Sequence, residues 1–180
     1  LEQAAADFAF LHALPGKKLI LKGNHDYWWT TRKKMDAFFA ANRWDSLRIV
    51  HNDAAAVDGC VAVCGTRGWF FDAEEDADKK IVMREAGRLQ ASIDAARAAG
   101  LPPVVFLHYP PVFAGQECSE ILEVLRRNGI RRCYYGHVHG PGIRRAVCGD
   151  YGGLSLKLIS ADALGFTPLH VPYDTPETEE

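Results

Sequence analysis

Several polar side chains that could bind a metal ion or transfer a proton come directly after apolar runs of the sequence. Amide oxygens and imidazole nitrogens are ligands for divalent metal ions, and imidazoles also carry protons near neutral pH. Apolar runs of this kind are typical of strands, and sites in α/β proteins form where the carboxyl ends of strands meet. We therefore expect the amide and the imidazoles to converge in one cleft. The residues concerned, with one adjacent carboxylate, are Asn24, His25, Asp26, His108, His137 and His139.

The segment Gly-His-Val-His-Gly at residues 136–140 carries two of these imidazoles. Side chains alternate along an extended chain, so His137 and His139 would project to the same side. The flanking glycines would let the backbone come close to a metal ion without steric crowding. The other interpretation is a surface turn that happens to contain two histidines.

The segment Gly-Asn-His-Asp at residues 23–26 offers a different set of groups. Asn24 has a neutral oxygen that suits a divalent ion, and Asp26 could orient His25 through a ring N–H. A turn whose side chains cap the following helix would use the same residue types. His108, which follows an apolar run and precedes two prolines, could also be a buried core histidine.

In this order and spacing, the three segments resemble the calcineurin-like metallophosphoesterase superfamily, whose signature ends in Gly-Asn-His-Asp, an isolated His and Gly-His-x-His. The resemblance extends over residues 18–140. Residues 14–29 and 64–69, the latter Cys-Gly-Thr-Arg-Gly-Trp, look like a bacterial phosphohydrolase branch of that family. The resemblance implies hydrolysis of a phosphate-ester substrate at a centre of two divalent ions, which would be Mn, Fe or Zn.

The resemblance also implies a role for each candidate residue. His25 would contact the phosphate and assist the leaving group, and Asp26 would tune it. No residue is assigned to substrate binding beyond the phosphate. One metal ion would be bound by Asn24, His108 and His137. The other ion would be bound by His139.

Two further motifs of that family, Asp-x-His and Gly-Asp-x-x-Asp, would precede Gly23, and neither occurs in the sequence. We therefore expect a partial metallophosphoesterase domain over residues 1–173 that holds at most one metal ion. The alternative is a catalytically inactive fragment or a single-metal-binding module. A cysteine-dependent phosphatase is excluded, because no cysteine is followed six residues later by an arginine.

The composition favours one globular domain, with 180 residues of which 48% are hydrophobic. The formal net charge of −2 and the lack of a basic stripe argue against a nucleic-acid groove. Five scattered cysteines favour a reducing, cytoplasmic location, and no apolar stretch is long enough to span a membrane. The acidic residues 174–180 predict a solvated, disordered tail.

Strand-like and helical patterns alternate, which predicts an α/β domain. By resemblance this would be a β-sandwich flanked by helices (α/β/β/α) that lacks its first strands. Thr30 or Thr31 and Ser119 are the expected N-caps of two helices. Helices are expected at residues 1–13, 30–42, 75–99 and 119–128, and strands at residues 18–21, 47–51, 60–65, 104–107, 132–135, 154–160 and 168–173.

Other polar and aromatic residues allow more than one interpretation. Arg67 could contact phosphate or support its own loop. The aromatic residues 27–29 could line a substrate pocket or bury the start of the next helix, and we favour burial for at least one tryptophan. The remaining histidines are expected to be packing or surface residues, namely His12, His51 and His170.

Overall fold

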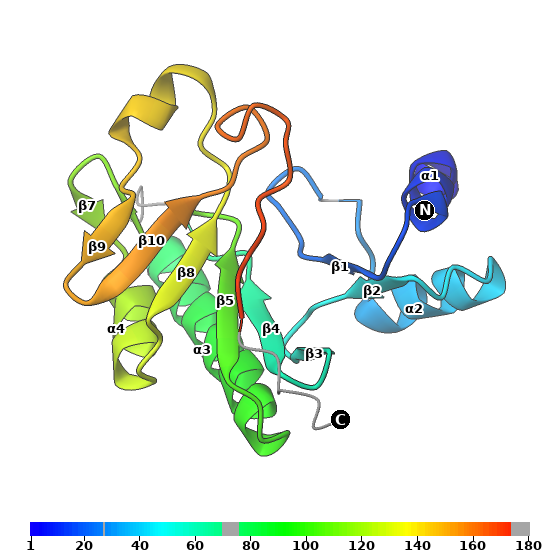
Figure 1. Ribbon diagram of the computed structural model, residues 1–180, viewed down its shortest axis with the longest axis horizontal. Helices are drawn as coiled ribbons and strands as arrows, with labels where there is room; N and C mark the ends of the chain where they lie inside the picture. Colours follow the sequence, from blue (N-terminus) through cyan, green and yellow to red (C-terminus); the bar gives the residue numbers. More distant parts are fainter. Residues whose placement is uncertain (27, 70–75, 174–180) are drawn as a thin grey trace, which may run out of the picture.

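The computed structural model of the chain describes residues 1–26, 28–69 and 76–173 (Figure 1). Tyr27 and the acidic tail at residues 174–180 lie outside the described residues, so the predictions made for them stay predictions. Within the described ranges, none of the helices has both the length and the apolar character that a membrane crossing requires.

The centre of the structure is a six-stranded sheet with the order β3-β4-β5-β8-β10-β9. The four inner strands are parallel, and the outer strands β3 and β9 are antiparallel to their neighbours. The carboxyl ends of the parallel strands therefore share one edge. The strands are β3 (Ala55–Val57), β4 (Val61–Thr66), β5 (Pro103–Leu107), β8 (Arg132–Tyr135), β9 (Gly149–Tyr151) and β10 (Leu154–Leu158).

Two helices, α3 (Asp76–Ala98) and α4 (Ser119–Arg127), cover one face of this sheet (Figure 1). Their apolar side chains form one core with the inward-facing residues of the parallel strands. The predicted amphipathic stripe of the long helix is confirmed, since all its members are buried. This stripe consists of Val82, Ala86, Leu89, Ile93 and Ala96.

The N-terminal part forms a smaller unit around the parallel pair β1 (Lys18–Ile20) and β2 (Leu47–Ile49). It also contains the short helix η1 (Glu2–Ala4) and the helices α1 (Ala5–Ala13) and α2 (Arg32–Ala41). Thr31 is the N-cap of α2, and its hydroxyl accepts a hydrogen bond from the backbone of Lys34. The buried residues of this second core are Phe8, Met35, Phe39, Leu47 and Ile49.

The α/β class with a central sheet flanked by helices is confirmed, but some local predictions are wrong. Ser119 is not a cap. It is the first residue of α4, and Cys118 holds the N-cap position without a side-chain hydrogen bond. Residues 168–173 form no strand. Val171 and Tyr173 instead pack on the sheet face that α3 and α4 leave uncovered.

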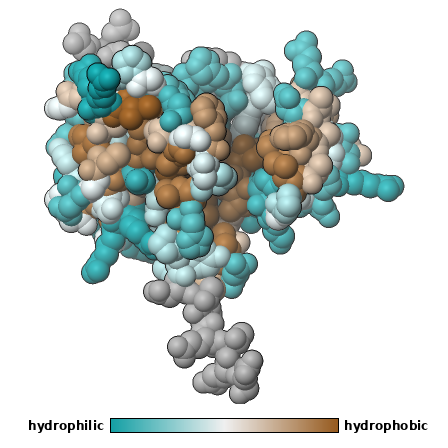
Figure 2. Space-filling model, turned by 45° about the horizontal axis from the view of Figure 1, so that its top comes forward, coloured by the Kyte–Doolittle hydropathy of each residue, from teal (hydrophilic) through white to brown (hydrophobic). Residues whose placement is uncertain are grey.

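Several short elements have no counterpart in the sequence patterns. They are the edge strands β3 and β9, the hairpin of β6 (Val112–Phe113) and β7 (Gln116–Glu117), and the 3-10 helix η2 (Gly140–Arg145). Figure 2 shows hydrophobic residues at the surface of the larger part and of the N-terminal unit. Phe10 and Phe166, for example, are largely exposed.

Candidate functional site

Three of the predicted metal ligands contact one another at the carboxyl ends of β1, β5 and β8. The Asn24 Oδ1 atom lies 2.6 Å from the His108 Nε2 atom. The His137 Nδ1 atom lies 3.2 Å from the same His108 nitrogen. His137 adopts a left-handed backbone conformation with φ of 69°, which turns the chain sharply at the strand end. We call Asn24, His108 and His137 the donor trio.

The imidazoles of the donor trio are kept neutral by their surroundings. Burial, followed by the nearby charges of His137, Arg67, His139 and His25, lowers the pKa of His108 to about 4. Burial, followed by the charges of His139 and His25, also lowers the pKa of His137. A neutral imidazole has a lone pair for a metal ion, so these two side chains have the protonation state of ligands.

His25 and Asp26 follow β1 but have different environments. The His25 side chain is exposed, and it is close enough for its charge to affect both histidines of the donor trio. The Asp26 Oδ2 atom accepts a hydrogen bond of 2.6 Å from the backbone N–H of Gly23. In the described part of the chain, no hydrogen bond joins Asp26 to the His25 ring. Asp26 therefore shapes the loop that presents Asn24.

His139 is paired with a carboxylate that the sequence motifs did not identify. The His139 Nδ1 atom lies 2.8 Å from Asp162 Oδ1, and Asp162 Oδ2 accepts a hydrogen bond of 2.8 Å from the backbone N–H of Gly140. These bonds, that from Gly140 first, lower the pKa of Asp162. The arrangement fixes the His139 ring and leaves its Nε2 atom available to a ligand. Asp162 follows β10, so the strand-end criterion could have found it.

The donor trio suits one metal ion rather than two. At ordinary bond lengths, two ligand atoms on a tetrahedral ion lie about 3.3 Å apart, so small side-chain adjustments would accommodate one ion. Among the residues that the structure describes, no group of three or more His, Cys, Asp or Glu side chains could hold a metal ion. The trio is not such a group, because one of its three donors is the amide of Asn24.

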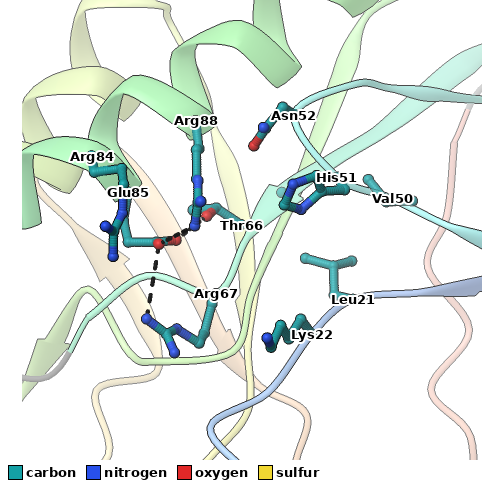
Figure 3. A pocket seen from close by; sticks show the side chains of 11 residues that line it. Leu21, Lys22, Val50, His51, Asn52, Thr66, Arg67, Arg84, Glu85 and Arg88 are labelled. Carbon is teal, nitrogen blue, oxygen red and sulfur yellow. Dashed lines mark hydrogen bonds and ion pairs between the residues drawn. The ribbon is translucent and has the colours of Figure 1, made fainter. Parts of the chain in front are cut away.

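Arg67 is close enough to this site for its charge to affect His108. It also has structural contacts, and the one with Glu85 is drawn in Figure 3. Its guanidinium is 4.7 Å from the centre of the Trp69 ring and 3.9 Å from Glu85 Oε1. Trp29 is partly buried against the N-terminal core, whereas Trp28 is 46% exposed. The expected burial of one tryptophan is thus partly met. The contacts of Arg67 agree with a role in supporting its loop, and its contact with phosphate stays a prediction.

Comparison with protein families gives one finding that bears on this site. A family model described as calcineurin-like phosphoesterase matches residues 1–141. The match covers well over half of the chain and includes the donor trio, His25 and His139. Searches of curated proteins and of solved structures gave no match.

Proposed function

Since the chain belongs to the calcineurin-like phosphoesterase family, whose members hydrolyse phosphoric esters with the help of metal ions, we propose that Asn24, His108 and His137 hold a divalent ion for this reaction. The observation that carries the proposal is the contact of the three donor atoms. His108 Nε2 lies 2.6 Å from Asn24 Oδ1 and 3.2 Å from His137 Nδ1. The donors come from three strand ends that are far apart in sequence. Their meeting at one point favours a shared ligand.

The proposed chemistry divides the work between the ion and the side chains. A bound divalent ion supplies positive charge that offsets the anionic phosphoryl group and lowers the pKa of water. The donor trio is neutral, so it leaves the full charge of the ion for the substrate. His25 is exposed beside the trio, and its ring can hold a proton for the leaving oxygen of the ester.

A two-metal centre is the finer part of the proposal. His139, with its Nδ1 atom held by Asp162, is the candidate ligand for the second ion. Bringing two ions close together requires a bridging donor, which the donor trio does not provide. The identity of the ions as Mn, Fe or Zn and the cytoplasmic location stay predictions.

The proposal predicts that hydrolysis by the full-length protein depends on metal. Treatment with a chelator should abolish hydrolysis of an aryl phosphate monoester and of the matching diester, and adding back Mn²⁺ or Zn²⁺ should restore hydrolysis of at least one of them. Both rates are measured from the absorbance of the released phenolate. Hydrolysis that survives complete metal removal would contradict the proposal.

The alternative function is a single-metal-binding module without catalysis. It is favoured by one observation, which is that all three donors of the trio are neutral and none is a carboxylate. Elemental analysis of the full-length protein separates the two functions. One tightly bound ion per chain, together with no hydrolysis of either ester, would support the module.

Asp162 offers a second test of the site. We predict that Asp162→Asn raises the metal concentration needed for half-maximal activity by about 10- to 100-fold, because a partner that orients a ligating histidine commonly contributes that much to metal affinity. The metal concentration that gives half-maximal activity is the measurement. Asp150→Asn is the matched control, since Asp150 also accepts a backbone hydrogen bond, from Gly153, but lies in the edge strand β9. Equal effects of the two variants would exclude a role of Asp162 at the site.

A further inference from the structure

A cavity of about 280 Å³ opens between the ends of β1, β2 and β4 and the first half of α3 (Figure 3). Pockets for drug-sized ligands have volumes of about 300–1,000 Å³, so this cavity suits a smaller chemical group. Leu21 and Val50 are its main apolar side chains. Most of its remaining wall is polar or charged.

The charge of the cavity wall is strongly positive. Four cationic side chains face a single carboxylate, so that three positive charges are left over. Like charges confined to a small space repel one another, and an anion between them relieves this repulsion. Among the described residues, neither Lys22 nor Arg84 has an ion-pair partner. The charged residues of the wall are Lys22, Arg67, Arg84, Glu85 and Arg88.

Glu85 fixes the position of two of the cations. Its side chain is buried, and its Oε1 atom accepts a hydrogen bond of 2.7 Å from Arg88 Nη1. The Arg67 guanidinium lies 3.9 Å from the same oxygen, and the Thr66 hydroxyl donates to Oε2. Figure 3 shows Arg67, Arg84 and Arg88 gathered around Glu85 on one side of the cavity. A buried carboxylate that holds guanidiniums in place makes the cavity wall preorganised for an anion.

Lys22 and His51 lie on the opposite side of the cavity (Figure 3). Partial burial is the main cause that lowers the pKa of His51, and the charges of Arg88 and Arg32 lower it as well, against the opposing charges of Asp53 and Glu85. His51 is exposed, as predicted for a surface residue, and it also lines the cavity, which the sequence did not indicate. In its neutral form it can donate or accept a hydrogen bond.

The cavity adjoins the donor trio. Lys22 is two residues from Asn24, and two residues of chain span at most about 7 Å between Cα atoms. On the other side, the backbone N–H of Tyr109, the neighbour of His108, donates a hydrogen bond of 2.8 Å to the Arg67 carbonyl oxygen. One small molecule can therefore reach both places.

We propose that this cavity is a phosphate-binding subsite that takes a second phosphate group of the substrate, next to the phosphate that is hydrolysed. Guanidinium and ammonium groups with several N–H donors are the protein groups best suited to a phosphate. The substrate would be a small molecule with two phosphate groups. This assignment of the bound group rests on the proposed function, whereas the anion site itself rests on the cavity.

The first experiment tests the subsite in the absence of metal. Inorganic phosphate is titrated by calorimetry into the full-length protein in the presence of chelator. Lys22→Gln and Arg84→Gln should each weaken binding about tenfold or more, because each removes a charge-assisted hydrogen bond. Both side chains have no ion-pair partner in the described residues, so folding should not depend on them.

A control variant sharpens this experiment. Lys33→Gln removes the same charge from an exposed position on α2. It should not change phosphate binding by the metal-free protein. If the wild-type protein shows no saturable binding, or if Lys33→Gln weakens binding as much as Lys22→Gln does, the subsite is overturned.

The second experiment tests whether the two sites act on one molecule. With Zn²⁺ present, propane-1,3-bisphosphonate should bind the wild-type protein about tenfold or more tightly than propylphosphonate, because its two ends can occupy both sites. Lys22→Gln should remove this difference. If Zn²⁺ does not strengthen binding of propylphosphonate, the proposed metal site fails. If Zn²⁺ strengthens it but the bisphosphonate gains nothing, only the second-phosphate assignment is overturned.

Discussion

Replacing His137 with alanine should remove both the bound metal ion and the activity, whereas replacing His25 with alanine should leave the metal ion bound and slow the reaction. His137 supplies a nitrogen 3.2 Å from that of His108, so its loss removes one of three donors. His25 is exposed, and among the described residues no hydrogen bond joins it to the trio. A general acid contributes about 10²–10⁴-fold to a rate, and that is the expected loss in kcat.

The measurement combines metal content by elemental analysis with kcat at saturating metal, both on the full-length protein. His170→Ala is the control, because His170 is exposed and borders a different cavity beside β8 and β10. It should change neither quantity. Equal loss of metal in the His25 and His137 variants would show that His25 is a ligand and not the proton donor.

Most of the larger elements could be predicted because their side-chain patterns match their burial. The stripe of α3 has the helical period, and the apolar residues of β4 and β5 point into the core. The ligand candidates could be predicted for a related reason. A polar residue just beyond the carboxyl end of a strand is well placed for a site. His108 directly follows β5, His137 comes two residues after β8, and Asn24 comes four residues after β1.

The features that escaped prediction depend on contacts between distant residues. Strands of two or three residues, such as β6 and β9, are too short to show a period. Residues 168–173 alternate as a strand does, but their side chains pack on the sheet face without joining its ladder. Asp162 has no motif of its own, and its role depends on the position of His139.

The cavity shows most clearly that features formed by contacts between distant residues escape prediction from the sequence. Its cations come from the end of β1, the loop after β4 and the helix α3, and each looks like an ordinary solvated residue in the sequence. Glu85 occupies the edge of the apolar stripe of α3, where a charged residue is typical of a helix surface. Only the fold shows that Glu85 is buried and holds Arg88 and Arg67.

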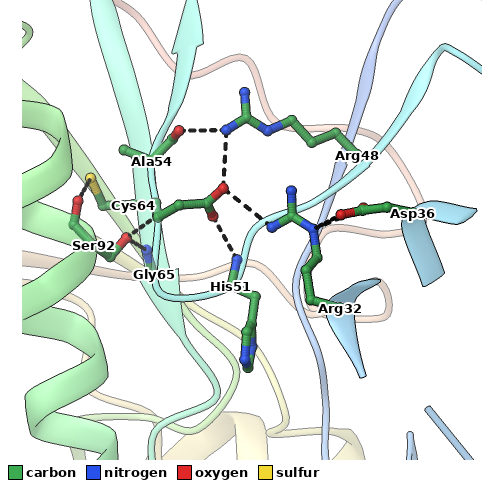
Figure 4. A network of polar contacts seen from close by, with 9 residues as sticks. Arg32, Asp36, Arg48, His51, Ala54, Cys64, Gly65 and Ser92 are labelled. Carbon is green, nitrogen blue, oxygen red and sulfur yellow. Dashed lines mark hydrogen bonds and ion pairs between the residues drawn. The ribbon is translucent and has the colours of Figure 1, made fainter. Parts of the chain in front are cut away.

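The packing that sets the donor trio also predicts a large effect on stability at Gly65. An added Cβ atom would lie 2.1 Å from the Phe106 carbonyl oxygen and 2.6 Å from Leu21 Cδ2. The Gly65 N–H also donates to Ser92 Oγ at 3.0 Å, within the polar network of Figure 4. Gly65→Ala must therefore shift backbone, and we expect it to lower the free energy of unfolding by about 3 kcal/mol or more.

Gly87→Ala is the matched control for this prediction, because it makes the same substitution with the opposite expected sign. Gly87 lies within α3, and an added Cβ atom would meet nothing within 4 Å. Alanine should stabilise the helix there by about 0.5–1 kcal/mol. Urea unfolding followed by circular dichroism gives both values. If Gly65→Ala changes stability by less than about 0.5 kcal/mol, as a surface substitution does, then neither Phe106 nor Leu21, which follows β1, lies this close to Gly65. The placement of Asn24 opposite His108 would lose its support.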